Sequence, residues 1–551
     1  MRTVEDDIVI WMEKVFDKKR QINIFFENLI WWIAMPFFSI ISFLTFFFTT
    51  ELADGYKGAY DVKFSPLIVI VLILITVVVI FLFCYGKENE LKRSNIVKTV
   101  FFIGLFESML WIFIADVGPA FDSLDLVYAT EALRGSTDGL AICKWEYANY
   151  LSRFPFQTSI VCLLYLCMSI AGENYIIFYE IINCFACAFA MAGIVILTGE
   201  ISDNTMSIAL SGLMTILFFP MVLYCTFIYG NIIALPFLIY SFYWQKKALS
   251  GEKNVWCCLA ISIGLMGISI FIKSTMIIGA LAECCVYLFQ ILQGVNKKKF
   301  LIYILCMVCT LKASTLFSAP VNSFIEKKVN IDLDEGVPSI AWITMGLGGG
   351  KEYQADMEND DILATDIKNA GYYDGFVWAL SSEEYSRKAM KSISIKYLLR
   401  RIQHFVSDPD LMLRYIAEKF AIEWTNPDFE SFLASNWDYL QVNGYNQAKR
   451  SMTKLTASFY YGTVHDVLFN MMDIMQTLLS MGTLWWLIFN NKGKIARCVE
   501  LIVVLGYAAV FLLWENKTQY MFPAYLLMIP MASNGWRLMC CLIIDLGTKV
   551  R

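Results

Sequence analysis

The stretch PLIVIVLILITVVVIFLFC at residues 66–84 carries no charge, and a helix needs roughly 20 such residues to cross a bilayer. The whole chain has 551 residues, of which 58% are hydrophobic and 17% are charged. Soluble globular domains carry about 25% charged residues. The formal net charge is only −5 and no domain is basic, which argues against a nucleic-acid partner. The sequence therefore predicts an integral membrane protein.

Further apolar stretches of this kind follow one another along the chain. The first three spans are expected near 29–49, 66–85 and 100–115. The later candidates are 156–172, 175–198, an apolar region at 206–244, 256–272, 275–292, 300–318, 466–489, 499–514 and 521–542. Together they predict an all-α polytopic membrane protein with about 12 to 14 transmembrane helices.

Lysine and arginine collect in segments that the positive-inside rule assigns to the cytoplasm. These segments hold Lys92 and Arg93, Lys246 and Lys247, residues 297–299, residues 492–497, and Lys549 with Arg551. The rule therefore places both termini in the cytoplasm.

The order of spans in the middle of the chain is not settled by these charges. A count from the N-terminus leaves 199–205 outside, and two more crossings would then place Lys246 outside as well. One segment between 156 and 244 is therefore miscounted. A re-entrant or broken helix around Pro220, 229–231 and Pro236 is one resolution.

These assignments divide the chain into four parts. Residues 1–22 place apolar and basic side chains at helical spacing, which predicts an amphipathic helix in the cytoplasmic membrane interface. Residues 23–318 form a transmembrane region whose first external loop is 116–155. Residues 319–464 form a mainly α external domain, inserted before the last three spans. Residues 465–551 hold the C-terminal transmembrane helices.

Three acidic residues begin the first external loop, directly after a span. They are Asp116, Asp122 and Asp125, and a helical pattern follows at 124–133. An aspartate at the start of a helix stays ionised, because free amides and the helix dipole favour its charge. The simplest interpretation is a helix cap. The alternative is a catalytic carboxylate at the depth of a lipid headgroup.

Polar residues are expected on the same side of the membrane in three other segments. Arg153 precedes the next apolar stretch, where it is either an interfacial anchor or an anion ligand. Lys273 follows the span at 256–272, as a snorkelling lysine or a phosphate ligand. The segment WENKTQYMFP at 514–523 separates the last two spans. Four polar sites on the side of the large domain favour an enzyme over a channel.

The cysteines and histidines give no sign of a metal site. Most of the sixteen cysteines lie in apolar stretches, where they are small buried hydrophobes, so we expect no structural disulfide. The two histidines, His404 and His465, are far apart in sequence and are expected to be ordinary surface or interface residues.

Several of these segments resemble the multi-spanning glycosyltransferases of the GT-C superfamily. The bacterial members concerned include protein mannosyltransferases, lipid-A aminoarabinose transferases and enzymes of cell-surface polymers. They carry an acidic residue in a Pro-x-x-Asp context in a long first external loop, followed by a helix rich in Tyr and Ala. PAFD at 119–122 and YATEA at 128–132 match this, and RFPFQ at 153–157 resembles the element that closes the loop. WITMGL at 342–347 and KFAIEW at 419–424 resemble two external elements.

The end of the chain departs from the family pattern at one position. The family carries Glu followed by Arg-Tyr and Pro; Glu515, Tyr520 and Pro523 fit, but Gln519 stands where Arg is usual. Lys517 is therefore the candidate that supplies the missing charge. The YGN segment at 229–231 likewise lacks the Asp that is often found in related sequences.

The resemblance implies inverting transfer of a sugar from a polyprenyl-phosphate donor to a cell-surface glycan, lipid or protein on the outer face of the cell membrane. A carboxylate would take the proton of the acceptor hydroxyl, and a cation would stabilise the departing lipid phosphate. The expected base is Asp122, with Asp125 or Asp116 as alternatives. The competing phosphate ligands are Arg153, Lys273 and Lys517. The expected substrate-binding residues are Gln157, Glu515, Gln519 and Tyr520.

No cofactor is expected. Some relatives use a divalent metal, and the acidic residues Glu358, Asp360 and Asp361 could bind one, but such a run is usually a solvated loop. The main rival function is a transporter or flippase of lipid-linked saccharides, which also has many spans, broken helices and buried charges. A non-catalytic scaffold derived from the same fold is a third hypothesis.

Overall fold

The protein is described by a computed structural model that covers residues 4–53, 59–85, 92–115, 118–119, 122–135, 150–151, 153–251, 254–293, 297–329, 333, 336–348, 369–372, 376–377, 380, 386–436 and 453–550. We refer to these as the described residues.

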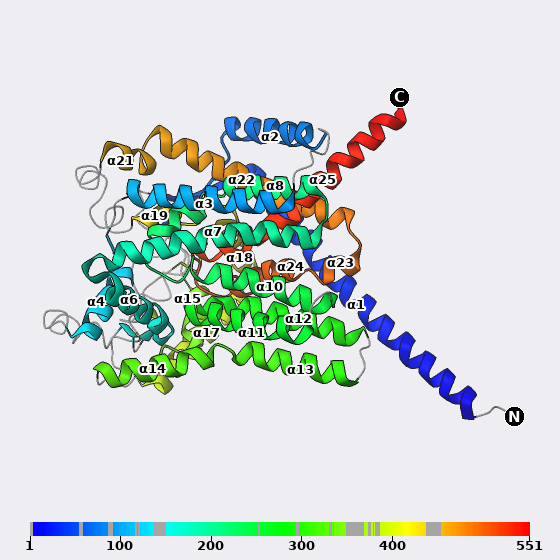
Figure 1. Cartoon of the computed structure of the whole chain (residues 1–551), viewed down its shortest axis with the longest axis horizontal. Coiled ribbons are helices and arrows are strands. Elements are labelled where there is room, and N and C mark those ends of the chain that lie inside the picture. Colours follow the sequence, from blue (N-terminus) through cyan, green and yellow to red (C-terminus); the bar gives the residue numbers. More distant parts are fainter. Residues whose placement is uncertain are drawn as a thin grey trace.

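Long helices run side by side between two ends of a bundle (Figure 1). Both chain termini leave the bundle at one end, which we call the terminal end. The opposite end, on the left in Figure 1, is the loop end. The helices that run between the two ends are α1 (Val4–Phe47), α2 (Leu67–Tyr85), α3 (Arg93–Ala115), α7 (Tyr175–Ile201), α8 (Thr205–Ile216), α10 (Ala234–Ser250), α11 (Val255–Ile272), α12 (Ile277–Leu292), α13 (Lys297–Lys312), α22 (Thr463–Phe489), α24 (Val499–Phe511) and α25 (Phe522–Val550).

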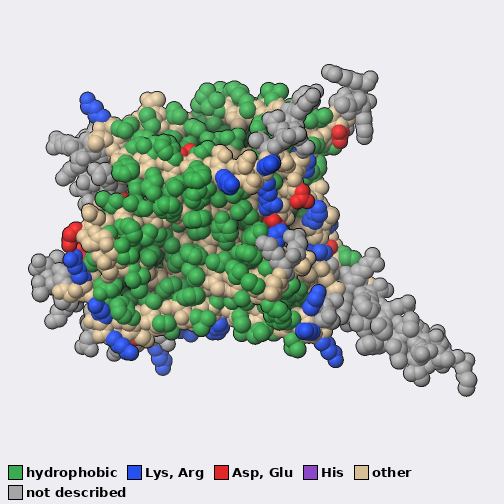
Figure 2. Space-filling view, in the orientation of Figure 1, with side chains coloured by type: hydrophobic (Ala, Val, Ile, Leu, Met, Phe, Trp, Pro, Cys, Tyr) green, Lys and Arg blue, Asp and Glu red, His purple; other side chains and the backbone are tan. Residues whose placement is uncertain are grey.

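The outer surface of this bundle is apolar. Figure 2 shows hydrophobic side chains over the middle of one face, with charged side chains gathered toward the two ends. On the outer surface of the bundle, single apolar side chains are largely exposed, such as Leu67 (76%) and Phe113 (77%). Soluble monomers rarely expose a continuous apolar surface of this extent, because water would drive it to associate. This surface is suited to contact with lipid tails.

Within the described chain, eight helical segments are long and apolar enough to cross a membrane, and a bent pair is a ninth. Other helices that join the two ends are shorter or more polar. Helix α24 is apolar but has only 13 residues, and α22 carries Asp466 and Asp473. The fold is that of an all-α polytopic membrane protein, as the sequence predicts.

The N-terminal part of the chain contains one helix and a hairpin. The residues predicted as an interfacial helix and those predicted as the first span are continuous in α1. Two strands that the sequence analysis missed follow at the loop end, β1 (Phe48–Ala53) and β2 (Ala59–Phe64). They pair antiparallel with Phe48 opposite Phe64, and they are the only sheet among the described residues.

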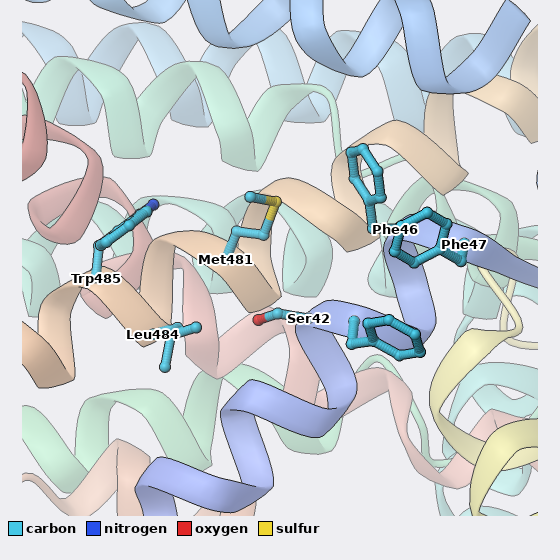
Figure 3. A pocket seen from close by; sticks show the side chains of 7 residues that line it. Ser42, Phe46, Phe47, Met481, Leu484 and Trp485 are labelled. Carbon is cyan, nitrogen blue, oxygen red and sulfur yellow. The ribbon is translucent and has the colours of Figure 1, made fainter. Parts of the chain in front are cut away.

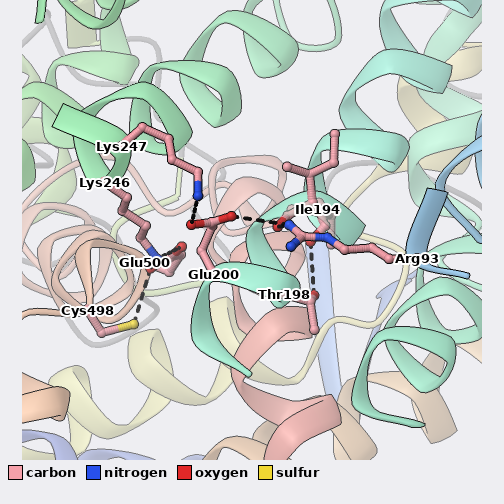
Figure 4. Close-up of polar contacts among 9 residues, drawn as sticks. Arg93, Ile194, Thr198, Glu200, Lys246, Lys247, Cys498 and Glu500 are labelled. Atoms are coloured by element: carbon pink, nitrogen blue, oxygen red, sulfur yellow. Dashed lines mark hydrogen bonds and ion pairs between the residues drawn. The ribbon is translucent and has the colours of Figure 1, made fainter. Parts of the chain in front are cut away.

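An ion-pair network joins four helices at the terminal end (Figure 4). Glu200 of α7 accepts from Arg93 at 3.2 Å and from Lys247 at 3.0 Å. Lys246 lies 2.6 Å from the fully buried Glu500 of α24. The ends of α7 and α10 therefore lie beside the starts of α3 and α24.

The position of α6 shows which segment between 156 and 244 was wrongly counted as a span. Helix α6 (Thr158–Ala171) begins and ends at the loop end, because the turn η2 (Gly172–Asn174) after it is tied back to α4 (Asp122–Arg134). Arg134 at the end of α4 lies 2.9 Å from Glu173. Helix α7 then makes a single crossing to the terminal end.

The chain next makes a bent pair of helices near Pro220, where the sequence allowed a re-entrant or broken helix, but this bend is not what resolves the miscounted span. Helix α8 is followed by α9 (Pro220–Leu223) and η3 (Tyr224–Thr226), and the two halves meet at 45°. Proline breaks a helix because it lacks an amide hydrogen and its ring collides with the preceding turn.

The bend receives a buried turn, residues 426–436, which belongs to the predicted external domain. Every residue of this turn is buried. Phe429 packs against Phe218 and Tyr525, and Tyr224 donates a hydrogen bond to the carbonyl oxygen of Phe429. The turn therefore fills the space that the broken span opens, so the domain and the bundle share one core.

The helices that lie between α13 and α22 in the chain gather toward the loop end. They are α14 (Thr315–Val329), α15 (Ser339–Gly346), α17 (Arg387–Ser407), α18 (Pro409–Thr425), α19 (Ser431–Ser435) and α21 (Lys454–Tyr460). The short helix α23 (Lys492–Ala496) lies at the terminal end. Helices α17 and α18 lie where the helical patterns at 383–405 and 409–422 were expected. Asp408 caps α18 by accepting a hydrogen bond from the amide of Leu411 at 3.0 Å.

An apolar cavity of about 270 Å³ opens between α1 and α22 (Figure 3). It is lined by Ser42, Phe43, Phe46, Phe47, Met481, Leu484 and Trp485. Close by, the hydroxyls of Thr45 and Ser480 join the two helices at 2.8 Å. Phe43 and Phe47 of its lining are exposed, so the cavity lies at the outer surface of the bundle.

Candidate functional site

The first polar residue of the site is Asp122, at the start of α4. The helix lies on the bundle through Ser123, whose hydroxyl donates to the carbonyl oxygen of Ile228 at 3.2 Å. The Asp122 side chain is half-buried, and it has no hydrogen bond or ion pair with any described residue. Its carboxylate is therefore available to a ligand.

The second is Lys273, which separates α11 from η4 (Ser274–Met276). Its ammonium lies 4.2 Å from the centroid of the Tyr229 ring, which stabilises the cation through the negative face of the ring. Among the described residues, no carboxylate forms an ion pair with it. Burial lowers the pKa of Lys273 to about 7, and the nearby Asp122 carboxylate opposes this shift.

The YGN segment at 229–231 holds the Tyr229 ring in this place. A Cβ atom on Gly230 would lie 2.5 Å from the carbonyl oxygen of Ile272, so only glycine allows the segment to approach the end of α11 so closely. Tyr179 donates a hydrogen bond to the Tyr229 carbonyl oxygen at 2.9 Å, and the Tyr229 hydroxyl bonds to that of Tyr150.

The third group is the polar segment between α24 and α25, including η7 (Thr518–Tyr520). The ammonium of Lys517 lies 3.3 Å from Oε1 of Glu515, and Tyr520 donates to Oε2 of Glu515 at 3.2 Å. Glu515 is 1% exposed, so this pair is held inside the protein. Burial opposes the charge of Lys517, but the carboxylates around it, Glu515 first, raise its pKa well above the usual value.

These three groups form one electrostatic cluster. Burial raises the pKa of Asp122, while the positive charges of Lys517 and then Lys273 pull it down. Asp122, Lys273 and Lys517 therefore act on one another electrostatically, and Glu515 and Tyr520 lie beside Lys517.

Sequence reasoning missed the residues that complete the cluster. Glu430, in the buried turn, accepts a hydrogen bond from the hydroxyl of Tyr60, which lies on β2. The amide of Thr518 donates to the same Tyr60 oxygen at 3.3 Å. Burial raises the pKa of Glu430 to about 7, against the pull of Lys517. Asp428 is buried beside it, and burial raises its pKa to about 6.

The motifs that carry the family resemblance meet behind this cluster. Lys419 is fully buried, and its ammonium donates to the carbonyl oxygens of Gly346, at 2.6 Å, and of Trp514. The Trp342 and Trp514 rings stack with centroids 6.0 Å apart. The WITMGL, KFAIEW and WENK elements therefore form one support, which fixes the backbone that precedes Glu515 and Lys517.

The other predicted site residues lie around the cluster or outside the described residues. Asp125 is one turn along α4 and half-buried, and Gln519 is half-buried in η7. Arg153 and Gln157 are buried at the entry to α6, in and beside η1 (Pro155–Gln157), where the Arg153 carbonyl oxygen accepts from the amide of Val337 at 3.1 Å. Asp116, Glu358, Asp360 and Asp361 lie outside the described residues.

The arrangement combines four carboxyl groups, two ammonium groups and several tyrosine hydroxyls at one end of a membrane bundle. Such a set can accept a proton and hold an anion at the same time. Within the described part of the chain, no group of three or more His, Cys, Asp or Glu side chains is arranged to hold a metal ion. No protein-family model, no curated protein and no solved structure matches this chain.

Proposed function

We propose that this protein is a membrane glycosyltransferase that moves a sugar from a polyprenyl-phosphate donor to a cell-surface acceptor. The observation that carries the proposal is a carboxylate and an ammonium that act on each other while neither forms an ion pair or a hydrogen bond with a described residue. Asp122 and Lys273 act on each other electrostatically, yet neither forms an ion pair. A site for a single-step displacement at a lipid phosphate needs a free base and a free cation of this kind.

In the proposed reaction, the acceptor oxygen attacks the anomeric carbon as Asp122 takes the hydroxyl proton. The bond between the anomeric carbon and the phosphate oxygen breaks, and the electron pair leaves with the lipid phosphate. Lys273 stabilises the charge on that leaving group, and Lys517 adds to the positive potential. One displacement inverts the configuration of the sugar.

The proposal also assigns an orientation. Arg93, Lys246, Lys247 and Lys492 lie at the terminal end, which the positive-inside rule assigns to the cytoplasm. The loop end, with Asp122 and the external segments, then lies outside the cell membrane. Polyprenyl-phosphate sugars present their headgroups at that surface once they have been flipped.

The test is sugar transfer by the purified full chain, given a labelled polyprenyl-phosphate sugar and isolated cell-envelope acceptor. We expect Asp122→Asn to lower the turnover number by about a hundredfold or more. Asparagine has nearly the same shape as aspartate but cannot act as the base. We expect Lys273→Met to raise the KM for donor and lower turnover. Lys298→Met, an exposed lysine at the terminal end, is the matched control. Transfer by Asp122→Asn at the wild-type rate would refute the assignment of the base.

A transporter or flippase of lipid-linked saccharides is the second candidate, favoured by the broken span. Broken helices line the substrate path of many transporters. Here the buried turn fills the bend with Phe429, which leaves the bend itself packed. If the wild-type protein moves the labelled lipid between leaflets of a vesicle and transfers no sugar, the transporter is correct.

A further inference from the structure

The buried turn presents Glu430 in an uncommon backbone conformation. Phe429 has a φ of 52° and Glu430 a φ of 56°, and they are the only non-glycine residues with positive φ among those described. Residues other than glycine, asparagine and aspartate rarely adopt the left-handed backbone region. Backbone strain of this kind is often found at functional sites. The turn is stabilised in this shape, since the Asn426 side chain accepts from the Glu430 amide at 3.3 Å.

Three separate segments meet at the Glu430 carboxylate. The external domain supplies Glu430 itself, the hairpin supplies the Tyr60 hydroxyl that donates to it, and η7 supplies the Thr518 amide that donates to Tyr60. Asn426 adds a second link, because it accepts from the Thr518 hydroxyl at 2.9 Å. Tyr60 therefore holds the carboxylate directly, and the 518–520 segment supports both Tyr60 and the backbone of the turn.

Lys517 connects this part of the site to the base. Its charge interacts with Glu515, Glu430 and Asp122. The cluster thus has Lys273 on one side and Glu430, Tyr60 and Asp428 on the other, and Lys517 interacts with both Asp122 and Glu430. Because the proposed donor phosphate requires Lys273 and the acceptor hydroxyl must reach Asp122, the Glu430 side remains for the rest of the second substrate.

The balance of charge on that side indicates what kind of group it accepts. The carboxyl groups are Asp122, Asp428, Glu430 and Glu515, against the two ammonium groups of Lys273 and Lys517. Burial raises the pKa of Glu430 to about 7 and that of Asp428 to about 6, so above that pH both are ionised and a donor phosphate bound at Lys273 would add to the negative charge. Glu515 is already paired inside the cluster, because its Oε1 lies 3.3 Å from the Lys517 ammonium and its Oε2 accepts from Tyr520 at 3.2 Å, so Glu430 is the carboxyl group that remains for a substrate.

Building on the proposed function, we propose that Glu430 and Tyr60 bind the acceptor, and that they select sugar hydroxyls against groups that carry a phosphate or a carboxylate. A carboxylate accepts hydrogen bonds from two neighbouring hydroxyls of a sugar, and Tyr60 fixes its orientation. An anionic acceptor would meet like charge in a site of low dielectric, which is strongly unfavourable. Glu430 is a specificity-determining residue, separate from the base.

The experiment uses the full-length protein in lipid vesicles with a labelled polyprenyl-phosphate sugar. Two matched acceptors are compared, a neutral oligosaccharide on a lipid anchor and the same oligosaccharide with one phosphate. The variants are Glu430→Gln, which keeps shape and removes charge, and Tyr60→Phe. Glu51→Gln is the control, because Glu51 lies exposed on the same hairpin. Slow hydrolysis of the donor by water is measured in parallel, since it needs no acceptor.

We expect Glu430→Gln to raise the KM for the neutral acceptor about tenfold, and to reduce the preference for the neutral over the phosphorylated acceptor by a similar factor. Donor hydrolysis and the KM for donor should change less than about twofold. Tyr60→Phe should raise the same acceptor KM with a smaller effect on the preference.

The outcomes separate this inference from the proposed function. A wild-type protein that neither hydrolyses donor nor transfers sugar refutes the glycosyltransferase. A wild-type protein that transfers sugar, combined with a Glu430→Gln variant of unchanged acceptor KM and preference, refutes the acceptor site alone. So does a variant that alters only the KM for donor. Thermal unfolding of each variant shows that the folded protein is being compared.

Discussion

Lys273 is the residue whose protonation should control donor binding. Its pKa is lowered to about 7 by burial, and a bound phosphate raises it, so binding of the donor takes up a proton above pH 7. Affinity is then full below pH 7 and falls as the pH rises. We expect the Kd for a polyprenyl-phosphate sugar to rise about tenfold from pH 6 to pH 8.

Equilibrium binding of a labelled donor in micelles measures this dependence. The phosphodiester itself does not titrate in this range, so the profile reports the protein. Glu430 also loses a proton near pH 7 and would weaken anion binding in the same direction. The Glu430→Gln variant should therefore keep most of the dependence of the donor Kd on pH. The Lys273→Met variant should bind the donor weakly, with a Kd that depends little on pH. A wild-type Kd that is constant from pH 6 to pH 8 would contradict the role of Lys273.

The terminal-end network allows a prediction about stability at the same scale. Glu500 is fully buried, and Lys246 is its ion-pair partner at 2.6 and 2.9 Å. Removing one member of a buried pair leaves an uncompensated charge, which costs about 3–5 kcal/mol. We expect Lys246→Met to lower the unfolding temperature in detergent markedly.

Two further variants make this comparison specific. Lys246→Met combined with Glu500→Met removes both charges and should recover most of the stability. Lys63→Met breaks the exposed pair with Glu51 and should cost less than about 1 kcal/mol. Equal unfolding temperatures for Lys246→Met and Lys63→Met would show that the buried network does not stabilise the bundle.

At the scale of elements, the contact between the YGN segment and the end of α11 positions the Lys273 cation. The Cβ of Gly230→Ala would collide with the Ile272 carbonyl oxygen, which belongs to a helix and cannot rotate away. The segment must shift, and the Tyr229 ring with it. We expect donor affinity to fall about tenfold.

Gly264→Ala on the same helix α11 is the matched control, because a Cβ there meets no atom within 4 Å. It should leave donor affinity unchanged and keep or raise the unfolding temperature, since alanine favours a helix. If Gly230→Ala binds donor as tightly as the wild type, the close approach has no part in the site.

The elements that could be predicted from the sequence are those with a strong local signal. Asp122, Lys273 and Lys517 were found because each interrupts or ends an apolar stretch, where a charge is costly and therefore informative. Glu430 gave no such signal. Its neighbours, NPDFE at 426–430, have the composition of an exposed loop, and only the broken span explains why this polar turn is buried.

The hairpin was missed for a similar reason. Its strands are short, and the apolar runs on either side dominate the periodicity. Tyr60, which bonds to Glu430, could therefore not be placed near the site from sequence. Strand pairing and the approach of 426–436 both depend on contacts between residues far apart in the chain, which no local pattern records.

At the scale of the whole molecule, the arrangement of both ends predicts which segments face the cytoplasm. The turn after α10, at Gly251, lies on the terminal side, and the junction of α17 and α18, at Ser407, lies on the loop side. Alkaline phosphatase needs disulfides that form only outside the cytoplasm. We expect a fusion after Ser407 to be active and a fusion after Gly251 to be inactive.

The same experiment tests the position of α6. A fusion after Asn174 should be active, because η2 lies beside Arg134 at the loop end. A green fluorescent protein fused at the same points gives the opposite pattern and controls for expression. Activity after Gly251 would reverse the orientation. Inactivity after Asn174 alone would make α6 a span. The sequence could not settle this point, because α6 is as apolar as a helix that crosses.

The buried turn also sets an order for biosynthesis. The broken span at 205–226 leaves the ribosome roughly 200 residues before the turn at 426–436, so at about 5–20 residues per second the bend stays unfilled for some 10–40 s. During that time Phe218 and Tyr224 have no Phe429 beside them. A chain that ends before residue 426 would keep the bend unfilled permanently and would be a substrate for membrane proteases.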